Sequence, residues 1–324
     1  MLKIGKLELA SNFILAPMAG ITDYPFRMFC RKFGCAMAFT EMINVRSLGY
    51  HSKKTRQMLF SDDKDKPLGV QILGCEPKFI LRALDILKNY KFDILDFNAA
   101  CPVKKVIRRG EGAALLKEPQ KLSRLLKLIV GNSAAPVTVK IRTGWDKDSV
   151  NARAVALAAQ DAGVSALFIH GRTKIQGYSG AVDYPAIRQA KAALDIPVIA
   201  SGDIYSAALA KKMFEETGCD AIAIARGALG NPWIFRELSS FFSDGRTLPR
   251  PAIEEKISAL EEHLDAYIDF YGEKNGVILF RKFFSWYTRG LRKIRPLRER
   301  ASRAKRKSEV MEMINAWVFT FNKV

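Results

Sequence analysis

Several side chains with reactive or hydrogen-bonding groups lie at or just after the ends of short apolar runs. Asn98 and Cys101 follow one run and His170 follows another, while Gln71 and Lys140 lie near the ends of two more. A thiol can move a proton or attack as a nucleophile, and a lysine can carry charge or form a Schiff base. Amide and imidazole groups can hold a ligand by hydrogen bonds. These groups can act together only if the fold brings the ends of the runs together.

The apolar runs alternate with stretches of helical periodicity, such as 79–89 and 151–162. Alternating strands and helices predict a parallel sheet, and eight such units predict a closed (β/α)8 TIM barrel. The carboxyl ends of barrel strands converge on one face, where active sites form. The predicted strands are 13–16, 37–40, 68–73, 94–97, 137–141, 166–169, 197–200 and 221–225.

A change of composition follows residue 242. The segment SDGRTLPRP at 243–251 has turn and linker chemistry. Beyond it, 253–271, 277–291 and about 302–321 have the periodicity of three or four amphipathic helices, without a strand signal. We therefore predict a barrel domain over 1–242, a linker over 243–251 and a small helical domain over 252–324.

The chain has 324 residues and a net charge of +19, with 52 Lys and Arg against 33 Asp and Glu. This excess favours a polyanionic partner, because neutralising phosphates releases counterions, although many basic proteins bind no nucleic acid. The 5 cysteines include no CxxC pair, which favours reduced thiols in the cytoplasm, and the 3 histidines lack the spacing of metal ligands. We expect neither a cleaved leader nor a membrane span, since no apolar run approaches about 20 residues.

The positive charge is concentrated near the C-terminus. The stretch 281–307 contains 12 Lys and Arg against one acidic residue, Glu299, and aromatic residues are interleaved at its start. A run of this kind is often a solvated helix face, and aromatics at helical spacing often form a core. The density of charge nevertheless favours a surface that follows a phosphate backbone.

Two glycine-containing segments follow the seventh and eighth predicted strands, ASGDI at 200–204 and ARGALG at 225–230. Loops at these positions often bind phosphate in barrels, because glycine lets backbone N–H groups approach the anion. They predict a phosphate-bearing cofactor. Lys140 would suit the anionic edge of a reduced flavin. The alternatives for Lys140 are a pair with Glu41 or Asp96 inside the barrel, or a Schiff base.

The string LDFNAACPVKKVIRRGEGAALL at 95–116 resembles the signature of the tRNA-dihydrouridine synthases, N-x-G-C-P-x-x-K-V followed by a glycine-containing loop. LAPMAGITDYPFR at 15–27, VKIRTGWD at 139–146 and IHGRTKIQGYSGAVDY at 169–184 agree in order and spacing. The resemblance covers nearly the whole barrel and is greatest to the bacterial B-type subgroup. Two residues depart from the pattern. Ala100 replaces a glycine, which affects the geometry of the loop, and Phe283 replaces a histidine, which we expect to remove a polar contact and alter tRNA docking.

The resemblance implies an FMN-dependent oxidoreductase that reduces specific uridines in tRNA to 5,6-dihydrouridine, with NADPH as the reductant. It implies hydride transfer from N5 of FMN to C6 of the uracil and proton transfer from Cys101 to C5. A thiol of ordinary pKa, about 8.5, is mostly protonated at neutral pH and can give that proton. FMN would be surrounded by Pro17, Met18, Ala19, Gln71, Lys140, His170, Gly202, Asp203, Arg226 and Gly227.

For the substrate, the resemblance implies that Asn98 binds the uracil edge and that Arg172 contacts the base or its phosphate. Lys104 and Lys105 would contact the tRNA backbone, with solvated surface lysines as the alternative. The loop 108–112 would move to carry the acid over the flavin. The barrel would be catalytic, the helical domain would bind tRNA, and the protein would be a cytoplasmic monomer.

Three alternatives stay open. Cys101 could be a small buried apolar side chain, the role that we assign to the other cysteines. The chain could be a flavin barrel of the dihydroorotate dehydrogenase type, which leaves the basic C-terminal region unexplained. It could also be a non-catalytic RNA-binding protein on a barrel scaffold, although Asn98, Cys101, Lys140 and His170 together argue against that.

Overall fold

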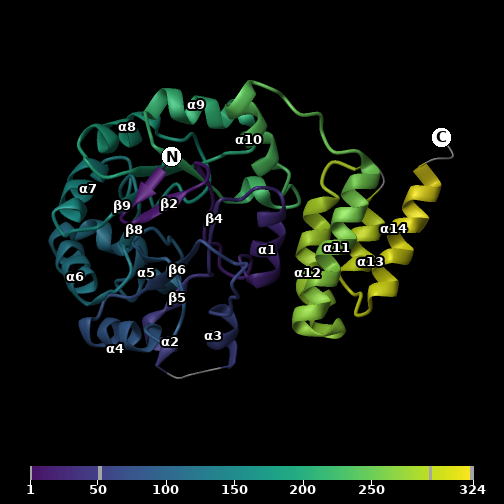
Figure 1. Ribbon diagram of the computed structural model, residues 1–324, viewed down its shortest axis with the longest axis horizontal. Helices are drawn as coiled ribbons and strands as arrows, with labels where there is room; N and C mark the ends of the chain where they lie inside the picture. The colour runs from purple at the N-terminus through teal and green to yellow at the C-terminus, as the bar shows by residue number, and fades with distance from the viewer. Residues whose placement is uncertain (1, 50–52, 292–293, 322–324) are drawn as a thin grey trace. The chain divides into compact units, whose positions relative to one another are not determined.

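Figure 1 shows a computed structural model of the chain, which describes residues 2–49, 53–291 and 294–321. The chain divides into two compact units, Met1–Arg226 and Gly227–Val324. Among the helices that the structure describes, none is long and apolar enough to cross a bilayer.

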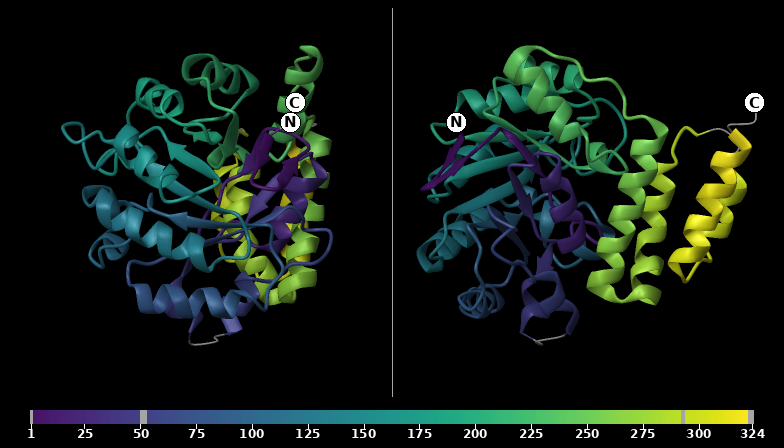
Figure 2. Two further views of the ribbon diagram at one scale, coloured as in Figure 1. Left: turned by 60° about the vertical axis from the view of Figure 1, so that its left-hand side comes forward. Right: turned by 45° about the vertical axis from the view of Figure 1, so that its right-hand side comes forward.

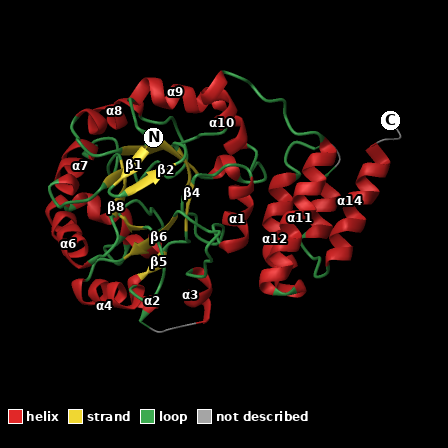
Figure 3. Ribbon diagram, in the orientation of Figure 1, coloured by secondary structure: helices red, strands yellow, loops and turns green. Residues whose placement is uncertain are grey.

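The first unit is a closed barrel of parallel strands, with helices around it (Figure 3). Neighbouring strands pair in the order β4, β3, β11, β10, β9, β8, β7, β6, and pairing of β4 with β6 closes the ring. All the predicted strands are confirmed, with ends that differ by at most one residue. They are β3 (Phe13–Leu15), β4 (Met37–Phe39), β6 (Leu68–Leu73), β7 (Ile94–Asn98), β8 (Val137–Arg142), β9 (Ala166–His170), β10 (Val198–Ser201) and β11 (Ala221–Ile224).

Amphipathic helices cover the outside of the barrel. In α4 (Pro77–Leu87), the buried residues Ile80, Ala83, Leu84 and Leu87 recur at the spacing of one helix face. Its proline at the first turn lacks only an N–H that would have no partner inside the helix. The other helices of this unit are α1 (Tyr24–Lys32), α2 (Val45–Leu48), α3 (Lys53–Met58), α5 (Lys104–Ile107), α6 (Pro119–Asn132), α7 (Ala152–Gln160), α8 (Tyr184–Ala192) and α9 (Ala207–Thr217).

A short antiparallel hairpin, β1 (Leu2–Ile4) and β2 (Leu7–Leu9), covers the amino ends of the barrel strands. Its apolar residues join a core cluster with Phe39 and Phe168 of the barrel. The turn requires Gly5, because φ is +58° and a Cβ would lie 2.9 Å from Pro136, directly before β8. The sequence did not predict this hairpin or β5 (Ile43–Asn44). The barrel strands were recognised as continuous apolar runs, whereas the strands LKI, LEL and IN are short and each contains a polar or charged residue.

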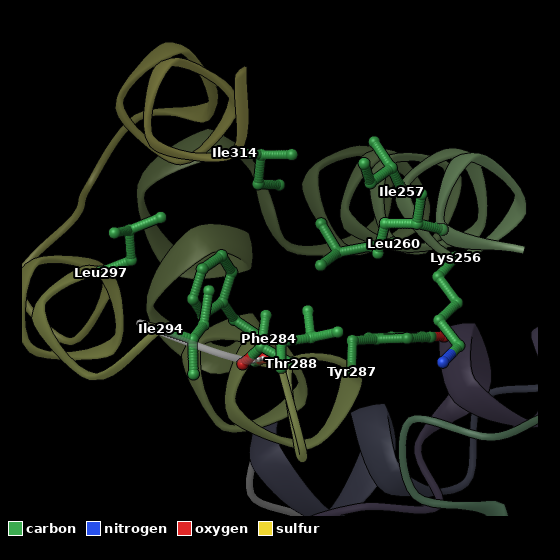
Figure 4. A pocket seen from close by; sticks show the side chains of 11 residues that line it. Lys256, Ile257, Leu260, Phe284, Tyr287, Thr288, Ile294, Leu297 and Ile314 are labelled. Atoms are coloured by element: carbon green, nitrogen blue, oxygen red, sulfur yellow. Dashed lines mark hydrogen bonds between the residues drawn. The ribbon is translucent and has the colours of Figure 1, made fainter. Parts of the chain in front are cut away.

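The second unit contains α10 (Ile234–Asp244), α11 (Ile253–Tyr271), α12 (Glu273–Tyr287), α13 (Arg295–Ala301) and α14 (Lys307–Phe321). In Figure 2, α11 to α14 are the yellow-green and yellow helices that run side by side. This confirms the predicted helical end of the chain. A small apolar pocket between these helices is lined by side chains that include Leu260, Phe284, Ile294 and Ile314 (Figure 4).

Phe283 is fully buried in an aromatic cluster of the second unit. Its ring centroid lies 4.7 Å from that of His263 and 5.2 Å from that of Tyr267. Burial among rings leaves Phe283 no surface with which to meet a partner. The expectation that this position alters tRNA docking by removing a polar contact is therefore replaced by a role in packing.

A buried ion pair joins α1 to the loop before β6. The Arg27 guanidinium donates to Asp65 Oδ2 through Nε at 2.8 Å and Nη2 at 2.6 Å, and both side chains are fully buried. Arg27 also donates to the backbone oxygens of Thr22 and Phe60, and Arg31 donates to Asp65 Oδ1. The pair therefore fastens the segment after β3, which carries part of the predicted site.

We predict that Asp65→Ala lowers the free energy of unfolding by about 3–5 kcal/mol, because it leaves a buried guanidinium without its counter-charge. Urea unfolding followed by circular dichroism would measure this. The control is Glu215→Ala, which removes the exposed partner of Lys211 and should cost at most about 0.5 kcal/mol. Equal small losses in both variants would contradict the role given to Asp65.

Candidate active site

The predicted residues at the strand ends lie on neighbouring strands of the barrel. Asn98 of β7 is in register with Lys140 of β8. His170 of β9 lies between Arg142 of β8 and Ser201 of β10. These groups therefore meet at the carboxyl end of the barrel, opposite the end that the hairpin covers.

Asn98 holds the start of the loop that contains Cys101. Its Oδ1 accepts hydrogen bonds from the backbone N–H groups of Ala100 at 3.0 Å and Cys101 at 2.8 Å. Such a local bond fixes the turn after the strand. Asn98 is buried, whereas Cys101 is partly exposed and lacks a disulfide partner.

Other contacts hold the same loop from its far side. Arg142 Nε donates to the Ala100 carbonyl at 2.7 Å, and the Ala113 N–H donates to the Cys101 carbonyl at 3.1 Å. Gly112 has a φ of +60°, and a Cβ there would lie 2.7 Å from the Cys101 carbonyl oxygen. Only glycine allows this approach. Every backbone polar group of Ala100 and Cys101 therefore has a partner in the loop or the barrel.

Burial raises the pKa of the Cys101 thiol, and Glu111 adds to this effect, while a backbone hydrogen bond from Val103 and the charge of Arg142 oppose it. The thiol is therefore protonated at neutral pH. A proton donor needs this state, whereas a nucleophilic cysteine needs a lowered pKa.

Gln71 and Asp96 lie beneath Asn98. Gln71 Oε1 accepts from Asn98 Nδ2 at 2.9 Å, and Gln71 Nε2 donates to Asp96 Oδ2 at 2.6 Å. Thr138 donates to the other oxygen of Asp96 at 2.6 Å. These side chains form one buried chain of hydrogen bonds that ends at Cys101.

Lys140 directs its ammonium to Ser201 Oγ at 3.3 Å. Within the described part of the chain it makes no ion pair, and Glu41 instead accepts a hydrogen bond from the Gly20 N–H. Desolvation lowers the pKa of Lys140 to about 8, against the charge of Asp96, which raises it. The group is thus still mostly cationic at neutral pH.

His170 is a neutral imidazole surrounded by cations. Burial lowers the pKa of His170 well below its usual value, and neighbouring positive charges lower it further. Its Nδ1 is buried without a hydrogen-bond partner among the described residues. The contributing cations are Arg142, Lys140, Arg172 and Arg226.

Asp203 joins the loops after β9, β10 and β11. One carboxylate oxygen accepts from Arg172 Nη2, and the other accepts from Arg226 Nη2 at 2.6 Å. Asp203 has a φ of 49° and follows Gly202, whose φ is 144°. The chain therefore takes a conformation here that ordinary side chains rarely adopt. This turn brings the carboxylate between the two arginines and sets the direction of Arg226.

Arg172 is 2% exposed and is occupied largely by its own loop, since it donates to the carbonyls of Ser179 and Gly180. Its Nη1 is buried and has no partner among the described residues. Nη1 is therefore the atom of Arg172 that is available to donate to a substrate or a phosphate.

The other predicted site residues occupy more varied positions. Pro17 and Met18 are partly buried and Ala19 is exposed, in the turn after β3. Lys104 and Lys105 are exposed on α5. Gly227 begins the second compact unit, so its place in the site stays a prediction.

The loop 108–112 has definite anchors. The Glu111 carboxylate accepts from Asn44 Nδ2 at 3.0 Å, and Cys75 Sγ lies 3.2 Å from the Arg109 carbonyl oxygen. Glu111 is buried. The predicted movement of this loop over a flavin stays a prediction, and it would have to break these contacts.

Sequence reasoning assigned no role to Arg142, Ser201 or Tyr178. The Tyr178 ring, which is exposed, has Arg142 at 5.4 Å and Arg226 at 5.1 Å from its centroid. Arg142 and Ser201 directly follow the predicted strands 137–141 and 197–200, and this position was the signal that could have found them. No signal in the sequence paired the arginines with Tyr178, because the pairing depends on how the loop 173–180 folds back.

A family model described as dihydrouridine synthase matches residues 14–321 of this chain. The chain belongs to the dihydrouridine synthase family. It is therefore an enzyme, and the alternatives of a dihydroorotate dehydrogenase and of a non-catalytic barrel are set aside.

Curated relatives agree with the family model. The chain is 42% identical over 301 residues to tRNA-dihydrouridine synthase B of Pseudomonas aeruginosa, covering 93% of this chain and 91% of that protein. It is 40% identical over 290 residues to tRNA-dihydrouridine synthase B of Pasteurella multocida, covering 90% and 87%. These relatives confirm the resemblance to the B-type subgroup.

Among solved structures, histamine dehydrogenase from Rhizobium sp. 4-9 has a TM-score of 0.58 at 13% identity, covering 82% of this chain and 50% of that chain. At this identity the likeness concerns the fold alone. It is consistent with the barrel described above.

We predict that His170 of this dihydrouridine synthase is still neutral at the pH where an ordinary histidine is half protonated, because protonation would add a buried charge among cations. Nuclear magnetic resonance of protein labelled with ¹⁵N-histidine would follow the ring nitrogens, with the His170→Asn variant identifying the signal. A titration midpoint near 6.5 would contradict the prediction.

Proposed function

We propose that this enzyme binds FMN at the carboxyl end of the barrel and reduces specific uridines in tRNA to 5,6-dihydrouridine. The observation that carries the proposal is the position of Cys101. A protonated, partly exposed thiol is held by its backbone next to buried amide and cationic groups. The tRNA substrate is supported by the names of the relatives.

The residues at the barrel mouth fit an anionic flavin nucleotide. His170 Nδ1 and Arg172 Nη1 are buried polar atoms without partners among the described residues, as expected of atoms that meet a ligand. Gly202 follows β10, the recurrent phosphate position of this fold. Lys140 and Arg226 add positive charge to the same end of the barrel, which favours the phosphate and the reduced ring.

A bound FMN, reduced in turn by NADPH, would supply the hydride for C6 of the uracil. The protein would supply the proton, and Cys101 is the group placed to give it to C5. Its raised pKa keeps the proton on the sulfur at neutral pH before it is transferred to C5. The opposing charge of Arg142 would stabilise the thiolate that remains.

Asn98 and Gln71 would orient the reacting groups. Each amide NH₂ group has two hydrogens, of which one is used in the chain that leads to Asp96. The second hydrogen of Asn98 can donate to a carbonyl oxygen on the edge of the uracil. Gln71, Pro17, Met18 and Ala19 would line the flavin.

The basic C-terminal stretch supports binding of tRNA by the second unit, but its cations have different roles. Arg281 donates to the Ala304 carbonyl, and Arg298 donates to Thr288. Lys307 pairs with Glu261 and Asp265. These cations hold helices together. Arg289, Arg300, Arg303 and Lys305 are exposed, and the described residues offer them no ion pair. Arg292 and Lys293 lie outside the described residues.

These exposed cations would contact the phosphate backbone, together with Lys104 and Lys105 of the barrel. Reducing a base in folded RNA also requires that the base leave its stack. Cationic contacts to the RNA around the site at the carboxyl end of the barrel would favour this step. We propose that residues 1–242 carry catalysis and that 252–324 bind tRNA. We further propose that the protein is a monomer. We also propose that it is cytoplasmic, since free thiols at all five cysteines are typical of a reducing compartment.

We predict that Cys101→Ala lowers the rate of dihydrouridine formation by about 10²–10⁴-fold, because the proton donor is removed. Mass spectrometry would count dihydrouridine in tRNA that initially lacks it, after incubation with enzyme, FMN and NADPH. Cys219→Ala is the matched control, since Cys219 precedes β11 at the opposite end of the barrel. Equal product from the wild type and from both variants would reject Cys101 as the donor. No product from any of them, in protein that still holds FMN and oxidises NADPH, would reject tRNA as the substrate.

We predict that Arg300→Ala combined with Arg303→Ala weakens tRNA binding and lowers the dependence of log K on log salt by about 0.7–0.9 for each phosphate that is no longer neutralised. Stability should not change. Arg298→Ala should instead lower thermal stability, because it removes hydrogen bonds to Thr288. Fluorescence anisotropy across a KCl series and thermal unfolding measure the two effects. An unchanged salt slope in the double variant would place the RNA surface elsewhere.

A further inference from the structure

The buried chain below Cys101 has a defined direction. Asp96 Oδ2 accepts from Gln71 Nε2, Gln71 Oε1 accepts from Asn98 Nδ2, and Asn98 Oδ1 accepts from two backbone N–H groups. Asp96 and Gln71 are 1% exposed and Asn98 is 6% exposed, so water has little access to replace a missing partner. Each member of the chain therefore depends on the next.

The two ends of this chain of hydrogen bonds require the same orientation of the side-chain amides of Asn98 and Gln71. The backbone N–H groups of Ala100 and Cys101 can only donate, so Asn98 must turn its oxygen to them and its NH₂ group to Gln71. Gln71 must then accept with its oxygen, which leaves its NH₂ group in need of an acceptor. An ionised carboxylate only accepts, and Asp96 supplies that acceptor.

The surroundings of Asp96 keep this carboxylate in place. Thr138 donates to Oδ1 from the neighbouring strand β8, in register with Asp96. Desolvation raises the pKa of Asp96 to about 6, against the hydrogen bonds from Gln71 and Thr138 and the charge of Lys140, which lower it. The carboxylate is therefore still largely ionised at neutral pH.

We propose that Asp96 is a positioning residue for the reaction, which acts through Gln71 and Asn98 to hold the backbone of Cys101. Asp96 hydrogen-bonds Gln71 and Thr138 and has no hydrogen bond to Cys101. Without the acceptor, the Gln71 amide turns away to avoid a buried unsatisfied N–H, and Asn98 loses its support. This inference rests on the proposed role of Cys101 as proton donor.

The nuclear magnetic resonance signal of the Cys101 backbone amide shows directly whether this chain of hydrogen bonds is intact. Labelling with ¹⁵N-cysteine gives one backbone signal for each of the 5 cysteines, and Cys101→Ala identifies the signal of Cys101. In Asp96→Leu we expect that signal to move upfield and its hydrogen exchange to accelerate by at least about tenfold. The other four cysteine signals should not change.

Two variants separate positioning from general damage to the core. Asp96→Asn should restore the Cys101 signal, because the asparagine oxygen can accept from Gln71 while its NH₂ group donates to Thr138 Oγ1. Thr138→Val removes one hydrogen bond from the same carboxylate but leaves the chain intact, so the Cys101 signal should stay as in the wild type. If Asp96→Leu does not fold, Gln71→Met breaks the chain one link later and should give the same change.

Reaction rates then test the consequence. In a single turnover of reduced enzyme with tRNA, Asp96→Leu should slow dihydrouridine formation by about 10²-fold, with unchanged tRNA affinity and with recovery in Asp96→Asn. A folded Asp96→Leu or Gln71→Met with an unchanged Cys101 signal would overturn the inference. A changed signal with an undiminished rate would keep the chain of hydrogen bonds but reject its role in the reaction. The role of Cys101 as donor is decided separately, by the rate of Cys101→Ala. Failure of the inference and failure of the proposed function thus give different results.

Discussion

The hydrogen bonds from the N–H groups of Ala100 and Cys101 to Asn98 Oδ1 determine where the thiol lies. They come directly after β7, where the chain leaves the barrel and the regular pairing of strands no longer fixes its course. The side chain of Arg142 donates to the Ala100 carbonyl, and the N–H of Ala113 donates to the Cys101 carbonyl. Because every backbone polar group of this turn is satisfied, the side chain of Cys101 is placed by the barrel itself rather than by a loop alone.

Positive charge is the second constraint on this end of the barrel. Arg142, Arg172, Arg226 and Lys140 all act on His170, and Asp203 compensates only part of this charge. Burial, and after it these charges, lower the pKa of His170 and keep its imidazole neutral, and burial is also the main cause of the lowered pKa of Lys140. Such an arrangement is costly without an anion and becomes favourable when one binds. The proposed phosphate and reduced flavin ring meet this requirement.

The sequence predicted the barrel well because its eight strands are continuous apolar runs that end in polar residues, and this pattern is local. It also identified Cys101, Asn98, Gln71, Lys140 and His170 as a group, since strand ends converge in a barrel. It did not predict the β1–β2 hairpin, because each of its short strands carries a charged residue and is not a continuous apolar run. The chain of Asp96, Gln71 and Asn98 was equally hidden, because it depends on register between strands and on amide orientation. The helical spacing of the aromatic residues indicates a core, and Phe283 lies among buried rings as that spacing predicts, rather than at a surface that meets tRNA.

The pH dependence of a single turnover tests the central claim most directly. Reduced enzyme would be mixed with tRNA that lacks dihydrouridine, and the return of the oxidised flavin absorbance would be followed between pH 7 and 8.5. A thiol with a raised pKa acts as a proton donor across this range, and the bound anionic flavin keeps Lys140 cationic. The account therefore predicts a rate constant that changes by less than about twofold. A rate that climbs by about tenfold per pH unit would show that the thiolate is the reactive form. That result would contradict the assignment of Cys101 as the acid.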